Sequence, residues 1–190
     1  MMSYVETIFL DVQPGHIPQV VSALSGLEGV GAWVTEIGRL NRITLLRTAD
    51  TYEALLDGRP DVLSSLPHEN LVRVEVTSWR AITPVADPGS YGSVYEWRCY
   101  EAKADGMGDV EERFLAAVPE REAVSPLTCT LVSLEGTPRI AHLWPYADMN
   151  ARSEKRAAAV ATGSWPPKVA PFLTRMESEI LLPLAISLWN

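Results

Sequence analysis

The sequence predicts an α+β fold made of two tandem ferredoxin-like repeats, each with the element order β-α-β-β-α-β. The same order of strand-like and helix-like segments occurs on both sides of a loop rich in glycine and proline. The strand-like stretch Arg139–Asp148 also has an earlier, degraded copy at Arg42–Arg47. Two sheets that each cover one face with helices can bury their bare faces together, so we expect one intramolecular α+β barrel.

The first repeat is expected over residues 1–84. Alternating apolar residues and an excess of β formers predict its strands. Pro18 suits the first turn of the first helix, and Gly58 and Pro60 interrupt the second helical segment. The expected strands are 4–10, 32–36, 43–47 and 71–76, and the expected helices begin near Pro18 and Thr51.

Residues 85–93 are expected to be a linker, and residues 94–190 to form the second repeat. Asp109 is expected to cap a helix with an apolar stripe, and Asp148 or Asn150 to cap one that reaches about Thr162. The stripe consists of Val110, Phe114, Leu115 and Val118. The expected strands are 95–101, 127–134, 139–144 and 177–184.

Composition excludes several classes of protein. The chain has 190 residues, of which 47% are apolar and 21% charged, and its net charge is -8. No basic footprint suits a nucleic acid, and no apolar run approaches the roughly 20 residues of a membrane span. The basic cluster Arg152, Lys155 and Arg156 shares its helix with Glu154, a pattern typical of a solvated helix face.

The two cysteines fall in expected strands and do not suggest a disulfide framework. With no recognisable signal peptide, this pattern favours the cytoplasm. The three histidines are scattered without metal-ligand spacing, so no metal site is expected. Neither a Gly-rich phosphate loop nor a Rossmann fingerprint occurs, and we therefore expect no cofactor.

Several motifs of the second half together resemble the NIPSNAP family of the dimeric α+β barrel superfamily. They are Tyr95-Glu-Trp-Arg-x-Tyr, Ser125-Pro126, Ile140-x-His-Leu-Trp-x-Tyr146, the helix 151–161, Trp165 and Glu177-x-Glu-Ile-Leu-x-Pro183. A weaker match in the first half is Thr35-Glu-Ile-Gly-x-Leu-Asn41.

The resemblance implies the barrel fold but no single activity, since the superfamily includes cofactor-free monooxygenases, haem-degrading enzymes, lyases and non-catalytic binders. This chain also departs from the family pattern, because Pro166 follows Trp165 at once where family members have several more residues. We expect access to a pocket to differ there.

Strand alternation separates Tyr95, Trp97 and Cys99 from the polar set Glu96, Arg98 and Tyr100. We expect the apolar set to lie under the helices and the polar set to point into the barrel. The neighbouring strand would add His142 and Trp144 to the same wall. His142 is then the candidate for proton transfer and Arg98 the candidate anion clamp, supported by Glu96 and Tyr100.

Comparison of the repeats places Leu45 opposite His142 and Arg47 opposite Trp144. On the first strand, Val5, Thr7 and Phe9 would take the places of Glu96, Arg98 and Tyr100. The expected barrel therefore has one polar and one apolar wall, as an amphipathic or aromatic ligand would require. The expected substrate-binding residues are Trp144, Thr7, Phe9, Leu45 and Arg47.

We accordingly expect a small-molecule binder or a cofactor-independent acid/base enzyme (an isomerase, cyclase, lyase or monooxygenase) acting on an aromatic or polyketide-like molecule. Two alternatives stay open, a non-catalytic scaffold and a haem-binding protein. The polar residues could also form a buried network that pairs only with itself. The internal repeat removes the need for a partner to close the barrel, but it does not forbid a homodimer.

Overall fold

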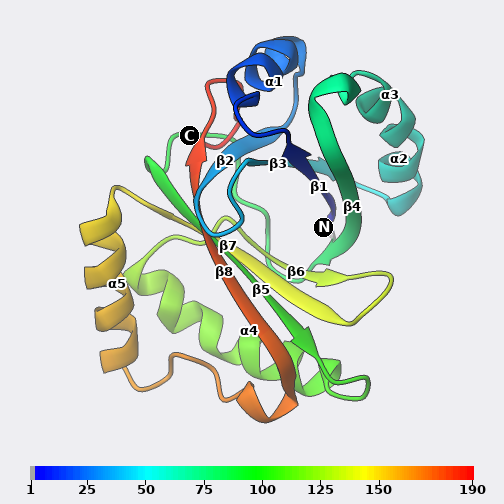
Figure 1. Ribbon diagram of the computed structural model, residues 1–190. Helices are drawn as coiled ribbons and strands as arrows, with labels where there is room; N and C mark the ends of the chain where they lie inside the picture. Colours follow the sequence, from blue (N-terminus) through cyan, green and yellow to red (C-terminus); the bar gives the residue numbers. More distant parts are fainter. Residues whose placement is uncertain (1–2) are drawn as a thin grey trace.

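A closed barrel of eight strands forms the centre of the computed structural model, which describes residues 3–190 (Figure 1). The strands are β1 (Tyr4–Val12), β2 (Gly31–Ile37), β3 (Arg42–Ala49), β4 (Leu71–Ala81), β5 (Val94–Ala102), β6 (Cys129–Ser133), β7 (Arg139–Tyr146) and β8 (Leu173–Pro183).

The order of strands around the barrel confirms the tandem ferredoxin-like topology. It runs β1-β3-β2-β8-β5-β7-β6-β4, and β4 pairs with β1 to close the ring. Each half places its first strand between its third and fourth, as this fold requires. The halves are joined by the antiparallel pairs β2–β8 and β4–β6. Barrel closure therefore needs only one chain.

The helices lie outside the ring, with α1, α2 and α3 around the strands of the first half and α4 and α5 around those of the second (Figure 1). No helix within residues 3–190 is long and apolar enough to cross a membrane. The helices are α1 (Ile17–Ala23), α2 (Tyr52–Asp57), α3 (Arg59–Ser64), α4 (Met107–Val124) and α5 (Met149–Ala161), with 3-10 turns at Leu24–Gly26, His68–Asn70 and Ala170–Phe172.

One of the expected helix caps is confirmed and one is wrong. The side chain of Asp148 accepts a hydrogen bond from the third residue of α5. Thr51, near which a helix was expected to begin, caps α2 in the same way. The helix α4 begins earlier than expected, after Gly106, which leaves Asp109 in the first turn. An acidic residue in the first turn interacts favourably with the helix dipole, and aspartate is also a common cap. The sequence alone therefore does not distinguish the two positions.

Two further details differ from the expectation. Pro60 does not simply end a helix, since it lies in the first turn of the separate helix α3. Leu115 is not part of the buried stripe of α4, because 37% of its surface is exposed.

The interior of the barrel is packed by apolar side chains from both halves. The rings of Trp33 and Trp189 stack at 6.3 Å, and Tyr95 contacts Trp33, so aromatic residues fill one end. The interior cluster consists of Val5, Phe9, Trp33, Leu46, Trp79, Ala81, Tyr95, Trp97, Cys129, Leu131, Ala141, Leu143, Leu181 and Trp189. Because this core mixes residues of both halves, we expect the two halves to unfold together.

Leu131 and Leu134 provide a matched test of this shared core. Leu131 of β6 is fully buried in the barrel, whereas Leu134 is 40% exposed. We expect Leu131→Ala to lower the free energy of unfolding by about 2–5 kcal/mol in a single transition. The same change at Leu134 should cost under about 1 kcal/mol. Urea unfolding followed by circular dichroism would measure both, and equal shifts would contradict a barrel core built by both halves.

Candidate functional site

The polar set of β5 lies outside the barrel, not inside it as expected. Tyr95 and Trp97 belong to the interior cluster, whereas Tyr100 and Trp144 pack with α4 on the outer face. The predicted neighbourhood is correct, because β5 pairs with β7 and Arg98 lies opposite His142. The facing was wrong for two reasons: the closed interior takes large aromatic residues, and Glu96 pairs on the outer face with Arg152 and Arg156 of α5.

Glu96 is the centre of the candidate site. Its side chain is 1% exposed. Its carboxylate accepts hydrogen bonds from Arg152 at 2.7 Å and Arg156 at 2.6 Å, both on α5, and from Arg98 at 3.2 Å. Burial alone would raise the pKa of Glu96, but the hydrogen bond from Arg152 and the charges of Arg156 and Arg98 outweigh it and hold the pKa below its usual value.

Positive charge exceeds negative charge around Glu96. Arg121 of α4 is 2% exposed, donates to the hydroxyl of Tyr146 at 2.9 Å and lies 4.1 Å from the ring centre of Trp144. Its Nε and Nη1 have no hydrogen-bond partner among residues 3–190. We call Arg98, Arg121, Arg152 and Arg156 the arginine cluster. A single buried carboxylate neutralises only part of its charge, which favours an anionic ligand.

Tyr100 is hydrogen bonded to this cluster through its oxygen. Nε of Arg98 donates to the Tyr100 hydroxyl. Burial raises the pKa of Tyr100 although the Arg98 charge opposes this, so the phenol stays protonated at neutral pH. Its hydrogen has no acceptor in the described part of the chain, and it can be donated to a ligand.

His142 is fully buried among aromatic rings. Its Nδ1 accepts a hydrogen bond from Nε1 of Trp144, so Nε2 carries the proton of the neutral ring. No residue of the described chain accepts from Nε2. Burial, followed by the charges of Arg98, Arg121 and Arg156, lowers the pKa of His142 well below its usual value. The imidazole is therefore neutral at physiological pH.

A pocket of about 220 Å³ adjoins these groups between α5, the loop after it, and the outer faces of β5 and β8. We call it the outer pocket. Arg98, Tyr100 and Arg156 supply its polar side chains, and a small void beside Glu96 shares Arg98 and Arg156 with it. The remaining lining residues are Phe114, Val160, Trp165, Pro166, Pro167, Val169, Ala170, Leu173 and Met176.

His142 lies behind the wall of this pocket. Its ring is 4.8 Å from that of Phe114, 5.3 Å from that of Tyr100 and 6.3 Å from that of Trp165, and all three of these residues line the pocket. Pro166, where the chain departs from the family pattern, lines it too. The structure thus brings Arg98, Tyr100, Glu96 and His142 together, with Arg98 and Tyr100 at the surface of the outer pocket.

The residues expected to bind substrate do not share one cavity. Trp144 packs under α4 and contacts His142 on the outer face of the second half. Thr7 and Phe9 face the barrel interior, where Thr7 accepts a hydrogen bond from Trp79. Leu45 packs beneath the helices of the first half, and Arg47 pairs with Glu6 at 3.0 Å on that side.

The comparison of the repeats was displaced by one residue on the first strand. Glu6, not Val5, occupies the place of Glu96, because Glu6 pairs with Arg47 as Glu96 pairs with Trp144. Glu6 is fully buried and also binds Arg59 at 2.6 Å. The two halves therefore each bury a glutamate under arginines. They differ in the surrounding residues, since Ile8, Leu10 and Leu45 replace Arg98, Tyr100 and His142.

Sequence reasoning missed the helical half of the site. Arg152 and Arg156 were interpreted as part of a solvated face, yet both reach the sheet. Their spacing of four residues on one helix face was the available signal. Arg121, on the other helix, carried no comparable signal.

The buried state of His142 predicts a pH dependence of stability. The folded protein keeps His142 neutral, whereas the unfolded chain protonates it below about pH 6.5. The free energy of unfolding is therefore highest above that pH and decreases as the pH falls. We expect a loss of roughly 1 kcal/mol per pH unit below that point, and a smaller slope for His142→Asn. Urea unfolding between about pH 7.5 and pH 5.5 measures this above the range where Glu96 titrates. Identical slopes in both proteins would refute it.

Comparison with known proteins gives relatives along most of the chain. A NipSnap homolog of Dictyostelium discoideum is 26% identical over 192 residues, which cover 93% of this chain and 85% of the relative. NipSnap homolog 2 of Mus musculus is 28% identical over 182 residues, which cover 83% of this chain. The match spans only 62% of that longer mouse protein.

Solved structures share the fold at low sequence identity. A candidate monooxygenase of Fusobacterium nucleatum is similar with a TM-score of 0.75 and 10% identity, over 98% of this chain and 94% of that one. An anthrone oxidase-like protein is similar with a TM-score of 0.63 and 12% identity, over 96% of this chain and 91% of that one.

The sequence profile of the NIPSNAP family matches residues 95–188, the half that contains the outer pocket, Glu96 and the histidine strand β7. The relatives extend the similarity into the first half. The chain belongs to the NIPSNAP family.

Proposed function

We propose that this protein binds a small anionic aromatic or polyketide-like molecule in the outer pocket and converts it by cofactor-independent acid/base chemistry. The arginine cluster carries the proposal, because it surrounds Glu96 with more positive charge than that carboxylate neutralises. The two unpaired cysteines, Cys99 and Cys129, would suit the reducing cytoplasm.

The lining of the outer pocket suits both parts of such a molecule. Arg98 and Arg156 offer guanidinium groups and Tyr100 a phenolic proton at one side, where a phenolate, enolate or carboxylate oxygen would be held. Phe114, Trp165 and Leu173 offer an apolar surface for the rings. A neutral ligand would leave the excess charge of the cluster uncompensated.

His142 is the proposed proton-transfer residue. The basic nitrogen of the neutral ring is Nδ1, so the indole of Trp144 must release it before the imidazole can take a proton. The positive charges beside the ring would stabilise the anion left when a carbon acid loses that proton. The ring lies one layer behind the pocket, so Phe114 or Trp165 must shift for direct contact with a substrate. The similarity to an anthrone oxidase-like protein suggests anthrone as a first substrate. Loss of a proton converts anthrone to its enolate, the anion that the arginines would hold, and O₂ converts anthrone to anthraquinone and water.

Binding is tested with 2-naphthoate and its uncharged analogue 2-naphthamide. We expect the naphthoate to bind at least about tenfold more tightly, and Arg98→Gln to remove most of that preference, because each charge-assisted hydrogen bond contributes about 1.5–3 kcal/mol. Arg80→Gln is the matched control, since Arg80 pairs with Glu111 and does not line the pocket. Titration calorimetry gives the affinities. Equal binding of both compounds would argue against an anion site and favour the scaffold alternative.

Catalysis is tested separately with anthrone under air. We expect His142→Ala to abolish anthraquinone formation, measured by absorbance, while circular dichroism and naphthoate affinity stay close to those of the parent protein. Full activity in His142→Ala would remove this residue from the mechanism. Naphthoate binding without turnover of any aromatic carbon acid would leave a binding protein rather than an enzyme.

A further inference from the structure

A second cavity, of about 240 Å³, opens at one end of the barrel and is separate from the outer pocket. We call it the barrel-mouth cavity. Its apolar side is formed by Phe9, Trp79 and Trp97, which belong to the interior cluster. The other lining residues are Cys99, Arg39, Arg42, Arg73, Glu75, Glu101, Arg139, Arg175, Glu177 and Glu179. The cavity therefore joins an aromatic floor to a charged rim.

Most charges of this rim are already paired. Arg73 binds Glu75 at 2.7 Å, and Arg175 pairs with Glu177 and lies 3.9 Å from Glu101. Arg39 and Arg42 share Asp11, and Arg42 also lies 3.8 Å from Glu179. The pairs of Arg73 and Arg175 are exposed and contribute little to stability, whereas Arg42 is buried. Their arrangement decides which charges remain free for a ligand.

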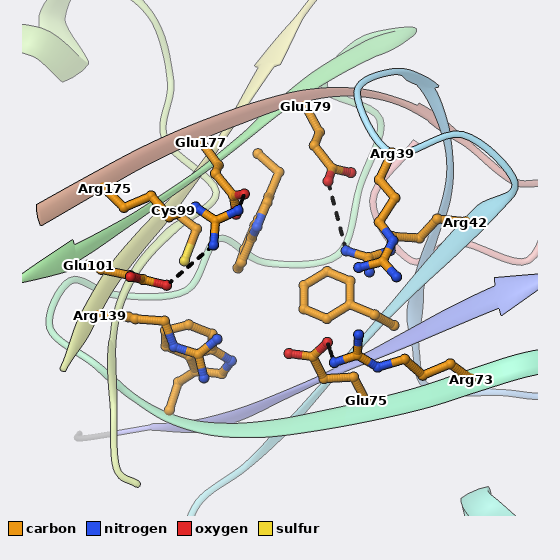
Figure 2. Close-up of a pocket in the computed structure, with 13 residues that line it drawn as sticks. Arg39, Arg42, Arg73, Glu75, Cys99, Glu101, Arg139, Arg175, Glu177 and Glu179 are labelled. Atoms are coloured by element: carbon orange, nitrogen blue, oxygen red, sulfur yellow. Dashed lines mark hydrogen bonds and ion pairs between the residues drawn. The ribbon is translucent and has the colours of Figure 1, made fainter. Parts of the chain in front are cut away.

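Arg139 is the exception, because no carboxylate of the described chain lies within ion-pair distance of it. Its guanidinium donates to the Thr77 hydroxyl at 3.1 Å and lies 5.2 Å from the ring centre of Trp79, and its Nε has no partner within residues 3–190. Across the cavity, Arg42 is 7% exposed and its Nη2 also lacks a partner there. Figure 2 shows Arg42 and Arg139 reaching into the cavity from opposite sides.

We propose that the barrel-mouth cavity is a second ligand site, which binds a single-ring aromatic monocarboxylate with its carboxylate on Arg139. Nε of Arg139 is enclosed by protein atoms, so a carboxylate would bind the guanidinium through its terminal nitrogens, with the charge-assisted geometry that guanidinium groups favour. The ring would lie on Phe9 and Trp97, whose centroids are 6.1 Å apart.

The lining and charge of the cavity set the ligand class. Its volume is close to that of the outer pocket, but its uncharged lining is confined to Phe9, Trp79, Trp97 and Cys99, so a single ring matches this surface better than a fused ring system. Glu101 and Glu177 lie near Arg139 and would repel a second negative charge, which disfavours a phosphate dianion. The thiol of Cys99 does not compete, because burial raises its pKa to about 12.

The test uses benzoate, benzamide and protein labelled with 5-fluorotryptophan, whose six tryptophan signals are assigned by single Trp→Phe variants. Fluorine NMR then reports where a ligand binds. We expect benzoate to shift the fluorine signals of Trp79 and Trp97 in the barrel. Benzamide should shift them only at a concentration at least tenfold higher. The tryptophans of the outer-pocket region, Trp144 and Trp165, distinguish the two sites.

Arg139→Gln should weaken the benzoate shifts at Trp79 and Trp97 at least tenfold, and Arg139→Lys should restore part of the affinity. Arg80→Gln, outside both cavities, is the control. Benzoate that shifts only Trp144 and Trp165, or that binds Arg139→Gln as well as the parent protein, would overturn the proposal. This result is independent of the naphthoate experiment, since either site can fail while the other is confirmed.

Discussion

The burial of Glu96 is the constraint on which the site depends. A carboxylate with 1% of its side chain exposed is tolerated only when cations and hydrogen-bond donors replace its water. Arg152 and Arg156 do so from α5, and Arg98 does so from the same strand. These pairs tie α5 to the sheet, and the outer pocket lies beside them.

The first half shows what the same arrangement looks like with fewer polar neighbours. Glu6 is buried under Arg47 and Arg59, but apolar residues occupy the rest of that outer face. An ion pair at this position is therefore common to both halves and suits holding a helix against the sheet. The additional groups of the second half, Arg121, His142 and Tyr100, exceed that structural need, and they lie where the outer pocket opens.

The closed barrel divides the chemistry of the chain into two compartments. Antiparallel pairs β2–β8 and β4–β6 tie the halves together, and aromatic residues fill one end of the interior. The opposite end keeps a charged cavity, while the outer pocket lies on the other side of β5. Neighbouring residues of β5 thus serve different cavities, Arg98 the outer pocket and Cys99 the barrel mouth.

The sequence by itself determined the element order, the pairing of β5 with β7 and the gathering of Glu96, Arg98, Tyr100 and His142, because strand periodicity and repeat topology are local or fixed by the fold class. It could not decide which face of the strand turns inward. Alternation defines two faces, but their environments depend on long-range contacts. Only the tertiary structure placed Arg121, Arg152 and Arg156 over Glu96, closed the interior around Trp33 and Trp97, and so put the candidate site outside the barrel.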